Sequence, residues 1–177
     1  MDFAYNDEQK EIIKVVRDLV QKEIVPYASE MDETGKLHEG LLEKLAAQGL
    51  LGVAIPEEFG GAGLDAITIA AIYEELGKGC AGVATTVAAN ALASYPVIIA
   101  GNDDQKKRYF DIINDDNLAA FALTEPGTGS DAGSVSTRAV KTEDGKGYIL
   151  NGTKCFITNG ALAEVFVVFA NTRKTGG

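Results

Sequence analysis

Apolar residues recur at intervals of three and four along the first two-thirds of the chain, which is the spacing of a helix with one buried face. The first helix is expected to begin after Asn6, because asparagine is a favoured N-cap and Gln9 stands three places on. Pro26 is expected to end or kink this helix. Its apolar stripe consists of Ile13, Val16, Val20 and Ile24.

Four more helices are expected before residue 118. They cover residues 41–46, residues 66–76, the uncharged 80s and residues 103–113. Gly49 is expected to end the first of these, since glycine is the usual residue just past a helix. Residues 1–118 are therefore predicted to form an all-α domain.

The uncharged stretch 79–102 is long enough to cross a bilayer. Small and polar residues keep its hydropathy low, and Pro96 is expected to break it. We therefore predict a buried core helix followed by a second helix, with no membrane insertion.

The periodicity changes near residue 119. Strand-like segments follow at residues 135–140, 148–150, 154–158 and 164–169. A turn is expected over residues 143–147, and Asn151-Gly152 is a strong hairpin signal. The pattern predicts an α+β chain, in which an antiparallel meander over residues 119–177 forms the first part of a β domain. The last strand would lie at an open edge shortly before Thr175-Gly176-Gly177, so either a partner pairs there or the natural protein continues and this β domain is incomplete.

Charge and composition narrow the function classes. The apolar fraction of 46% is ordinary for a globular protein, and the net charge of -10 disfavours nucleic acid or an anionic membrane as the main partner. Residues 1–118 hold 21 acids and 10 bases (net -11), whereas residues 119–177 hold 5 and 6 (net +1). An anionic ligand would therefore fit the second part better.

Metal and thiol chemistry lack the necessary residues. Cys80 and Cys155 have neither disulfide-framework nor CxxC spacing, and we expect both to be small buried hydrophobes. The single histidine, His38, is expected at the surface or as a helix cap, so no metal site is predicted. The N-terminus has no basic and apolar signal pattern, which favours a bacterial cytoplasm, with a mitochondrial matrix as the alternative.

The most informative segment is the glycine-rich loop at residues 121–133 (FALTEPGTGSDAG). Gly127, Gly129 and Ala132 fit the G-x-G-x-x-A dinucleotide pattern, but strand-like sequence follows where that fold needs a helix. The loop also lacks the Gly-Lys-Ser/Thr of a Walker A motif. Such a loop can approach a phosphate or a flavin closely, or can simply link the helices to the sheet.

Four ordered segments resemble the acyl-CoA dehydrogenase family. Residues 123–131 (LTEPGTGSD) resemble its first signature, and residues 151–160 (NGTKCFITNG) resemble the segment that follows. Residues 56–64 and 101–109 resemble its Pro-Glu…Gly-Gly-x-Gly turn and the helix start before its β domain. The resemblance spans the whole chain and implies a helical domain, a β domain and a C-terminal helical bundle.

The resemblance implies that FAD lies against the glycine-rich loop, and that Ser130 contacts the acyl-CoA thioester. It implies no catalytic residue in this chain, because the family's glutamate base lies in the C-terminal bundle and the role of Glu125 is structural. The chain alone is therefore expected to be inactive. The implied cofactor-binding residues are Phe121, Ala122, Leu123, Thr124, Gly129, Ser130, Phe156, Ile157 and Thr158.

The implied reaction is α,β-dehydrogenation of a short- or medium-chain acyl-CoA, with electrons passed to an electron-transfer flavoprotein by a homotetramer. The same chemistry in reverse, an enoyl-CoA reductase, remains open, as does an inactive helical binding module. The three hydroxyls of Thr124, Ser130 and Thr158 argue against the binding module, since only flavin chemistry would need them together.

Overall fold

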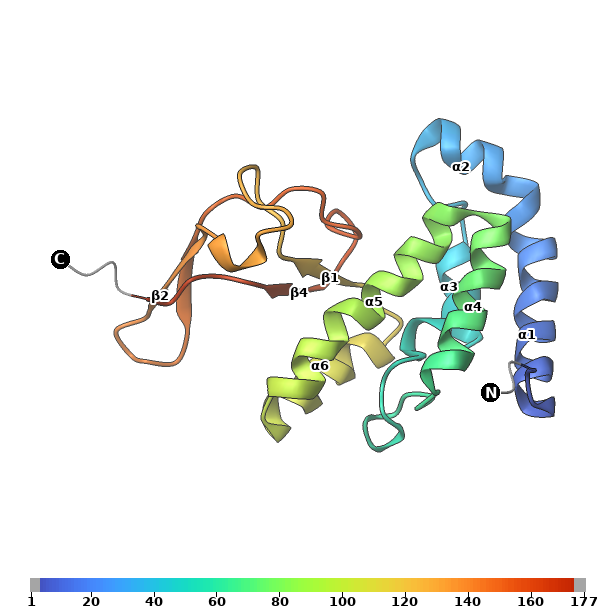
Figure 1. Ribbon diagram of the computed structural model, residues 1–177, viewed down its shortest axis with the longest axis horizontal. Coiled ribbons are helices and arrows are strands. Elements are labelled where there is room, and N and C mark those ends of the chain that lie inside the picture. The colour runs from blue at the N-terminus through green and yellow to red at the C-terminus, as the bar shows by residue number, and fades with distance from the viewer. Residues whose placement is uncertain (1–3, 174–177) are drawn as a thin grey trace.

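The computed structural model describes residues 4–173, with the helices at one end and the strands at the other (Figure 1). This confirms the predicted α+β class, a helical part followed by a small β region. The end of the expected β domain, at residues 174–177, lies outside the described residues. The elements are α1 (Asp7–Leu19), α2 (Ala28–Thr34), α3 (Leu41–Ala47), α4 (Ala66–Gly79), α5 (Ala81–Ala100), α6 (Asp103–Asn114), β1 (Ala119–Ala122), β2 (Arg138–Lys141), β3 (Tyr148–Asn151) and β4 (Val165–Val168).

Local capping signals correctly mark where helices begin and end. Asn6 and Asn102 each form a capping box, in which the asparagine side chain and a glutamine three places on satisfy each other's backbone N–H. Gly49, just past α3, is left-handed with φ +69°, as a helix-ending glycine requires. These ends are predictable because both partners lie within a few residues.

The chain between α1 and α2 bends without leaving helical geometry. A π-helical turn at Val20–Ile24 follows α1, and a 3₁₀ turn at Val25–Tyr27 contains Pro26. Pro26 therefore kinks the path as expected, but α2 behind it was not predicted. His38 neither caps a helix nor lies free on the surface, since its ring stacks on Tyr27 at 3.6 Å.

The predicted break at Pro96 is wrong. Helix α5 runs unbroken from Ala81 to Ala100 with Pro96 inside it. Proline removes one helical hydrogen bond, and the last turn is retained because Val97 and Ile98 pack on a buried cluster with Phe110 and Ile113. Among the described residues, α5 alone has the length and hydropathy of a membrane span, and much of it packs on α4 and β1.

The predicted antiparallel meander is wrong in its connections. Strands β2 and β3 do form an antiparallel hairpin, with Ala139 opposite Leu150. Strand β4 instead pairs in parallel with β1, a strand that the sequence pattern did not reveal, and Phe121 stands opposite Val167. The β region is therefore two separate two-stranded sheets.

Residues 154–158 form a loop rather than the predicted strand. Phe156 and Asn159 have φ of +55° and +63°, which no β-strand can accommodate. Gly152 does not turn a hairpin but packs on Thr137, where a Cβ would lie 2.4 Å from the Thr137 hydroxyl oxygen. The same loop carries Cys155, which is half-buried like Cys80 rather than buried as predicted.

Helices α1 to α5 share one main core, and α1 is joined to α4 by a buried acid. The Glu75 carboxylate accepts two hydrogen bonds from Arg17, at 2.8 and 3.0 Å, and one from Lys78. Hydrogen bonding from Arg17 lowers the pKa of Glu75 to about 2, so this acid is charged at neutral pH. The pair fixes the orientation of α4, which carries one wall of the site described below.

Two asparagines join α5 to the start of β1. The fully buried Asn90 accepts a hydrogen bond from Ala119 N at 2.8 Å and donates to the carbonyls of Leu51 and Asn117. Asn159, in the loop before β4, donates to the carbonyls of Thr86 and Ala119. The strands and their loops are therefore held at a defined position along α5.

Replacing Asn90 with alanine is expected to destabilise the fold by about 2–4 kcal/mol, because it leaves the buried Ala119 N–H without its acceptor and two carbonyls without their donor. Urea denaturation measures the change. Ile99→Ala on the same helix is the matched control, since Ile99 is 81% exposed and its removal is expected to change stability little. Equal stability of the two variants would contradict this role of Asn90.

Candidate active site: an apolar groove along α5

A groove of about 520 Å³ lies between α4, α5 and the loops that follow β1 and β3. None of its lining residues is Lys, Arg, Asp or Glu, so its walls carry no formal charge at neutral pH. The lining residues are Tyr73, Thr85, Ala88, Ala89, Ala91, Leu92, Tyr95, Phe121, Leu123, Thr124, Phe156 and Thr158.

Helix α5 forms one long side of the groove. Thr85, Ala88, Leu92 and Tyr95 recur every three or four residues and so face the same way. At 1.5 Å per residue this stripe is roughly 15 Å long. Alanines in its middle leave room, so the groove is shaped for an elongated apolar group.

The opposite side consists of loop residues that present hydroxyls and one uncovered ring. Thr124 and Thr158, which both carry a hydroxyl group, are among the lining residues. Phe156 is held in a left-handed backbone conformation, and its side chain is 93% exposed. An exposed aromatic ring in a strained position beside a cavity is typical of a surface that packs on a flat ligand.

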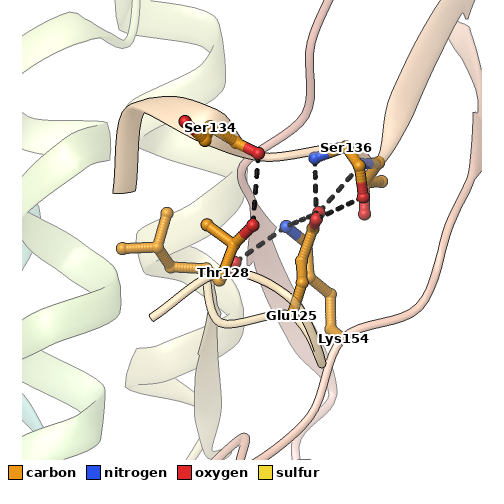
Figure 2. Close-up of polar contacts among 7 residues, drawn as sticks. Glu125, Thr128, Ser134, Ser136 and Lys154 are labelled. Carbon is orange, nitrogen blue, oxygen red and sulfur yellow. Dashed lines mark hydrogen bonds and ion pairs between the residues drawn. The ribbon is translucent and has the colours of Figure 1, made fainter. Parts of the chain in front are cut away.

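A buried carboxylate holds the two loops together. Glu125 accepts hydrogen bonds from Lys154 Nζ at 2.8 Å, from Thr137 N at 2.8 Å, and from the N–H and hydroxyl of Ser136 at 2.7 and 2.6 Å. Figure 2 shows Lys154 and Ser136 converging on Glu125 from different segments. We call Glu125, Ser136, Thr137 and Lys154 the Glu125 cluster.

Further hydrogen bonds shape the glycine-rich loop beside this cluster. Glu125 and Thr128 exchange two backbone hydrogen bonds of 3.0 Å, which close a tight turn around Gly127. The Thr128 hydroxyl donates to the Ser134 carbonyl (Figure 2). Cys155 N donates to the Thr124 carbonyl at 3.0 Å, so the loop at residues 121–133 and the segment at residues 151–160 lie directly side by side.

The Glu125 cluster keeps the Glu125 carboxylate ionised, and both of its oxygens accept hydrogen bonds. Hydrogen bonding from Lys154 holds the pKa of Glu125 well below its usual range, and the donors of Ser136 and Thr137 lower it further. A carboxylate that accepts four hydrogen bonds is a poor proton acceptor. Its role is to join the loops, in agreement with the structural role implied for Glu125.

The structure brings five of the nine expected cofactor-binding residues to the groove. Ala122 is buried within β1, and Ile157 is half-buried beside the lining. Gly129 and Ser130 are exposed on the glycine-rich loop, outside the groove. The five at the groove are Phe121, Leu123, Thr124, Phe156 and Thr158.

Sequence reasoning missed Tyr73. It reaches the groove from α4, and only the antiparallel pairing of α4 with α5 brings it beside the stripe of α5. No sequence motif marks it. No group of His, Cys, Asp or Glu suited to a metal ion occurs within residues 4–173.

Family comparison identifies the class of protein to which this groove belongs. The model of the acyl-CoA dehydrogenase N-terminal domain matches residues 6–114, and that of the acyl-CoA dehydrogenase middle domain matches residues 120–177. The chain therefore belongs to the acyl-CoA dehydrogenase family, as its motifs indicated. The family uses FAD.

Three relatives are similar over nearly the whole chain. An acyl-CoA dehydrogenase of Bacillus subtilis is 40% identical over 96% of this chain and 45% of its own length. A 3-(aryl)acrylate reductase of Clostridium sporogenes is 41% identical over 96% of this chain and 45% of its own. The solved butyryl-CoA dehydrogenase of Megasphaera elsdenii superposes with a TM-score of 0.88 at 37% identity, covering 100% of this chain and 47% of that one. The chain thus spans about half the length of the relatives it matches.

The Glu125→Gln variant tests the Glu125 cluster through the pH dependence of stability. Because the folded-state pKa lies below the ordinary 4.5, the charged carboxylate stabilises the fold above pH 4.5, and this contribution is lost as pH falls toward the folded-state pKa. We expect the variant to melt below the wild type at pH 7, with the gap closing under acid. Melting temperature against pH measures this.

Glu143→Gln is the matched control, because Glu143 is an exposed acid in the turn between β2 and β3. It is expected to follow the wild-type melting profile at every pH. A Glu125→Gln profile that ran parallel to the wild type down to strong acid would mean that the charge of Glu125 does not stabilise the loops.

Proposed function

We propose that this chain forms the FAD-facing half of the active site of an acyl-CoA dehydrogenase, with the acyl group of the substrate lying in the α5 groove. The single observation that carries the proposal is the convergence of both family signatures on one uncharged groove through the Glu125 cluster. Members of this fold solved with FAD, such as an acyl-CoA dehydrogenase of Bacillus anthracis, support the choice of cofactor.

The residues of the groove and of the adjoining glycine-rich loop fit a flavin. Gly127 and Gly129 have no neighbouring atom within 4 Å of the position a Cβ would take, so a ligand can approach their backbone without obstruction. Phe156 offers a ring to pack on a flat heterocycle, and the hydroxyls of Thr124 and Thr158 can donate hydrogen bonds at its edge. The glycine-rich loop, the ring of Phe156 and the two threonine hydroxyls all belong to residues 121–158.

This arrangement assigns one part of the reaction to FAD and the other parts to residues of this chain. FAD, when bound, supplies the acceptor for the hydride that leaves the β-carbon of the acyl group. Thr124 and Thr158 donate hydrogen bonds that favour an electron-rich ring, while the apolar groove excludes water from the reacting carbons. Ser130, exposed on the glycine-rich loop, is assigned the contact with the CoA thioester that the family resemblance implies.

The base that removes the α-proton is assigned to the rest of the whole protein. No carboxylate lines the groove among the residues described here, and Glu125 is occupied by four hydrogen bonds. This chain therefore positions cofactor and substrate, while proton abstraction comes from outside it.

The class of substrate and the direction of the reaction are also part of this proposal. We favour oxidation of a short- or medium-chain acyl-CoA by a homotetramer in the cytoplasm, with an electron-transfer flavoprotein as electron acceptor. The relatives include both a dehydrogenase and a reductase, so reduction of an enoyl-CoA is the second candidate. A binding module without flavin is the third, and bound FAD in the purified protein would exclude it.

Gly129→Val in the whole protein is expected to abolish retention of FAD, because a β-branched side chain would block approach to the loop backbone. A Cβ at Gly129 meets no protein atom within 4 Å, so the fold itself should be unaffected. Flavin absorbance per protein after gel filtration measures the loss, and Gly129→Ala should lose less. Normal flavin content in a folded Gly129→Val variant would contradict the proposed cofactor position.

A further inference from the structure

Tyr73 carries a polar atom that the described chain leaves without a partner. It lines the groove from α4, and its side chain packs against the main core of the helices. Its hydroxyl is buried, and no hydrogen-bond partner for it occurs within residues 4–173. A buried hydroxyl without a hydrogen bond costs about 1–3 kcal/mol, and folded proteins rarely leave one unpaired.

The hydroxyl of Tyr73 is a neutral donor. Burial raises the pKa of Tyr73 to about 12, so the proton stays on the phenol at any physiological pH. The groove offers no Lys or Arg among its lining residues to neutralise an anion. A carboxylate-bearing group would therefore enter this space at a high desolvation cost, whereas an uncharged oxygen would not.

The position of Tyr73 sets where such an oxygen would lie. Helices α4 and α5 are antiparallel neighbours joined through Cys80, with Tyr73 seven residues before it and Ala88 eight after it. At 1.5 Å per residue the two stand at about the same level. Both line the groove, so the backbone of Tyr73 stands opposite a residue whose side chain is only a methyl group.

The other polar groups that line the groove differ from the buried, unpartnered hydroxyl of Tyr73. The Thr85 hydroxyl donates to the Ala81 carbonyl at 2.7 Å and is thus satisfied within α5. Tyr95 is exposed, so water can satisfy its hydroxyl. Thr124 and Thr158 lie on the loop side, where the cofactor is proposed to bind. Tyr73 is left as the polar group that faces the acyl tail.

We propose that Tyr73 is a specificity-determining residue, whose hydroxyl donates a hydrogen bond to an uncharged oxygen on the acyl chain beyond the reacting carbons. The preferred substrates are then acyl-CoAs with a hydroxyl, carbonyl or ether oxygen in the tail, rather than plain alkyl or ω-carboxyl tails. This inference rests on the proposed function, since it requires the acyl group to lie in the α5 groove.

The test compares the wild type with Tyr73→Phe, which removes one oxygen atom and keeps the ring. The whole protein, loaded with FAD, is assayed on unbranched acyl-CoAs of increasing length, each ending in a methyl, hydroxymethyl or carboxylate group. At the length that reaches Tyr73, kcat/KM of the wild type should favour the hydroxymethyl end by about tenfold or more. In Tyr73→Phe the ratio of the two kcat/KM values should fall to about one. The change should come only from a lower kcat/KM for the hydroxymethyl substrate.

Binding gives a second readout that does not depend on turnover. Alkyl-CoA thioethers with the same three ends lack the thioester carbonyl, so they bind without reacting, and calorimetry gives their Kd values. The Kd ratio of methyl to hydroxymethyl end should drop by about tenfold in Tyr73→Phe. Tyr148→Phe is the control, because Tyr148 is exposed on β3 outside the groove and should leave the ratio unchanged.

The role of Tyr73 and the proposed function can be contradicted separately. If the protein binds acyl-CoA and reduces its flavin but the wild type and Tyr73→Phe show the same preference, the role of Tyr73 is wrong and the proposed function stands. If the CoA derivatives with a carboxylate end bind most tightly, the role of Tyr73 is also wrong and the proposed function also stands. If the protein neither holds FAD nor binds CoA derivatives, the proposed function fails and this inference fails with it.

Discussion

The ion pair between Glu125 and Lys154 is the interaction on which the rest of the site depends. The two residues stand 29 positions apart, one in each of the two family signatures, and they meet at 2.8 Å. Lys154 also donates to the Leu123 carbonyl, so a single ammonium group holds the lining residues on both sides of it. Together with the Cys155 N–H bond to the Thr124 carbonyl, this pair keeps Phe156 and Thr124 on the same groove.

The loops joined in this way are held against a rigid wall. Asn90 and Asn159 set the height of β1 along α5, and the Arg17–Glu75 pair holds α4 beside it. Polar side chains thus fix the position of every wall of a groove whose own surface is apolar. Satisfied buried polar groups specify one arrangement, and the apolar surface is left free to bind a ligand.

Sequence reasoning succeeded where both partners of an interaction are local. Capping at Asn6 and the helix end at Gly49 depend on residues within one turn, and the motifs identified the family. It failed where partners are distant, because β1 pairs with β4 over more than forty residues and the strand at 154–158 is prevented by the left-handed Phe156. Tyr73 reaches the site only through helix packing, which leaves no motif in the chain.

An anaerobic titration of the purified whole protein with a short-chain acyl-CoA, followed by the visible absorbance of its bound flavin, tests whether the groove and loops serve a flavin dehydrogenase. The account predicts that the protein is purified with FAD and that the absorbance bleaches as acyl-CoA is added, with the enoyl-CoA as product. A protein purified without flavin under conditions that retain it in relatives, or a bound flavin that neither acyl-CoA reduces nor enoyl-CoA reoxidises, would contradict the account.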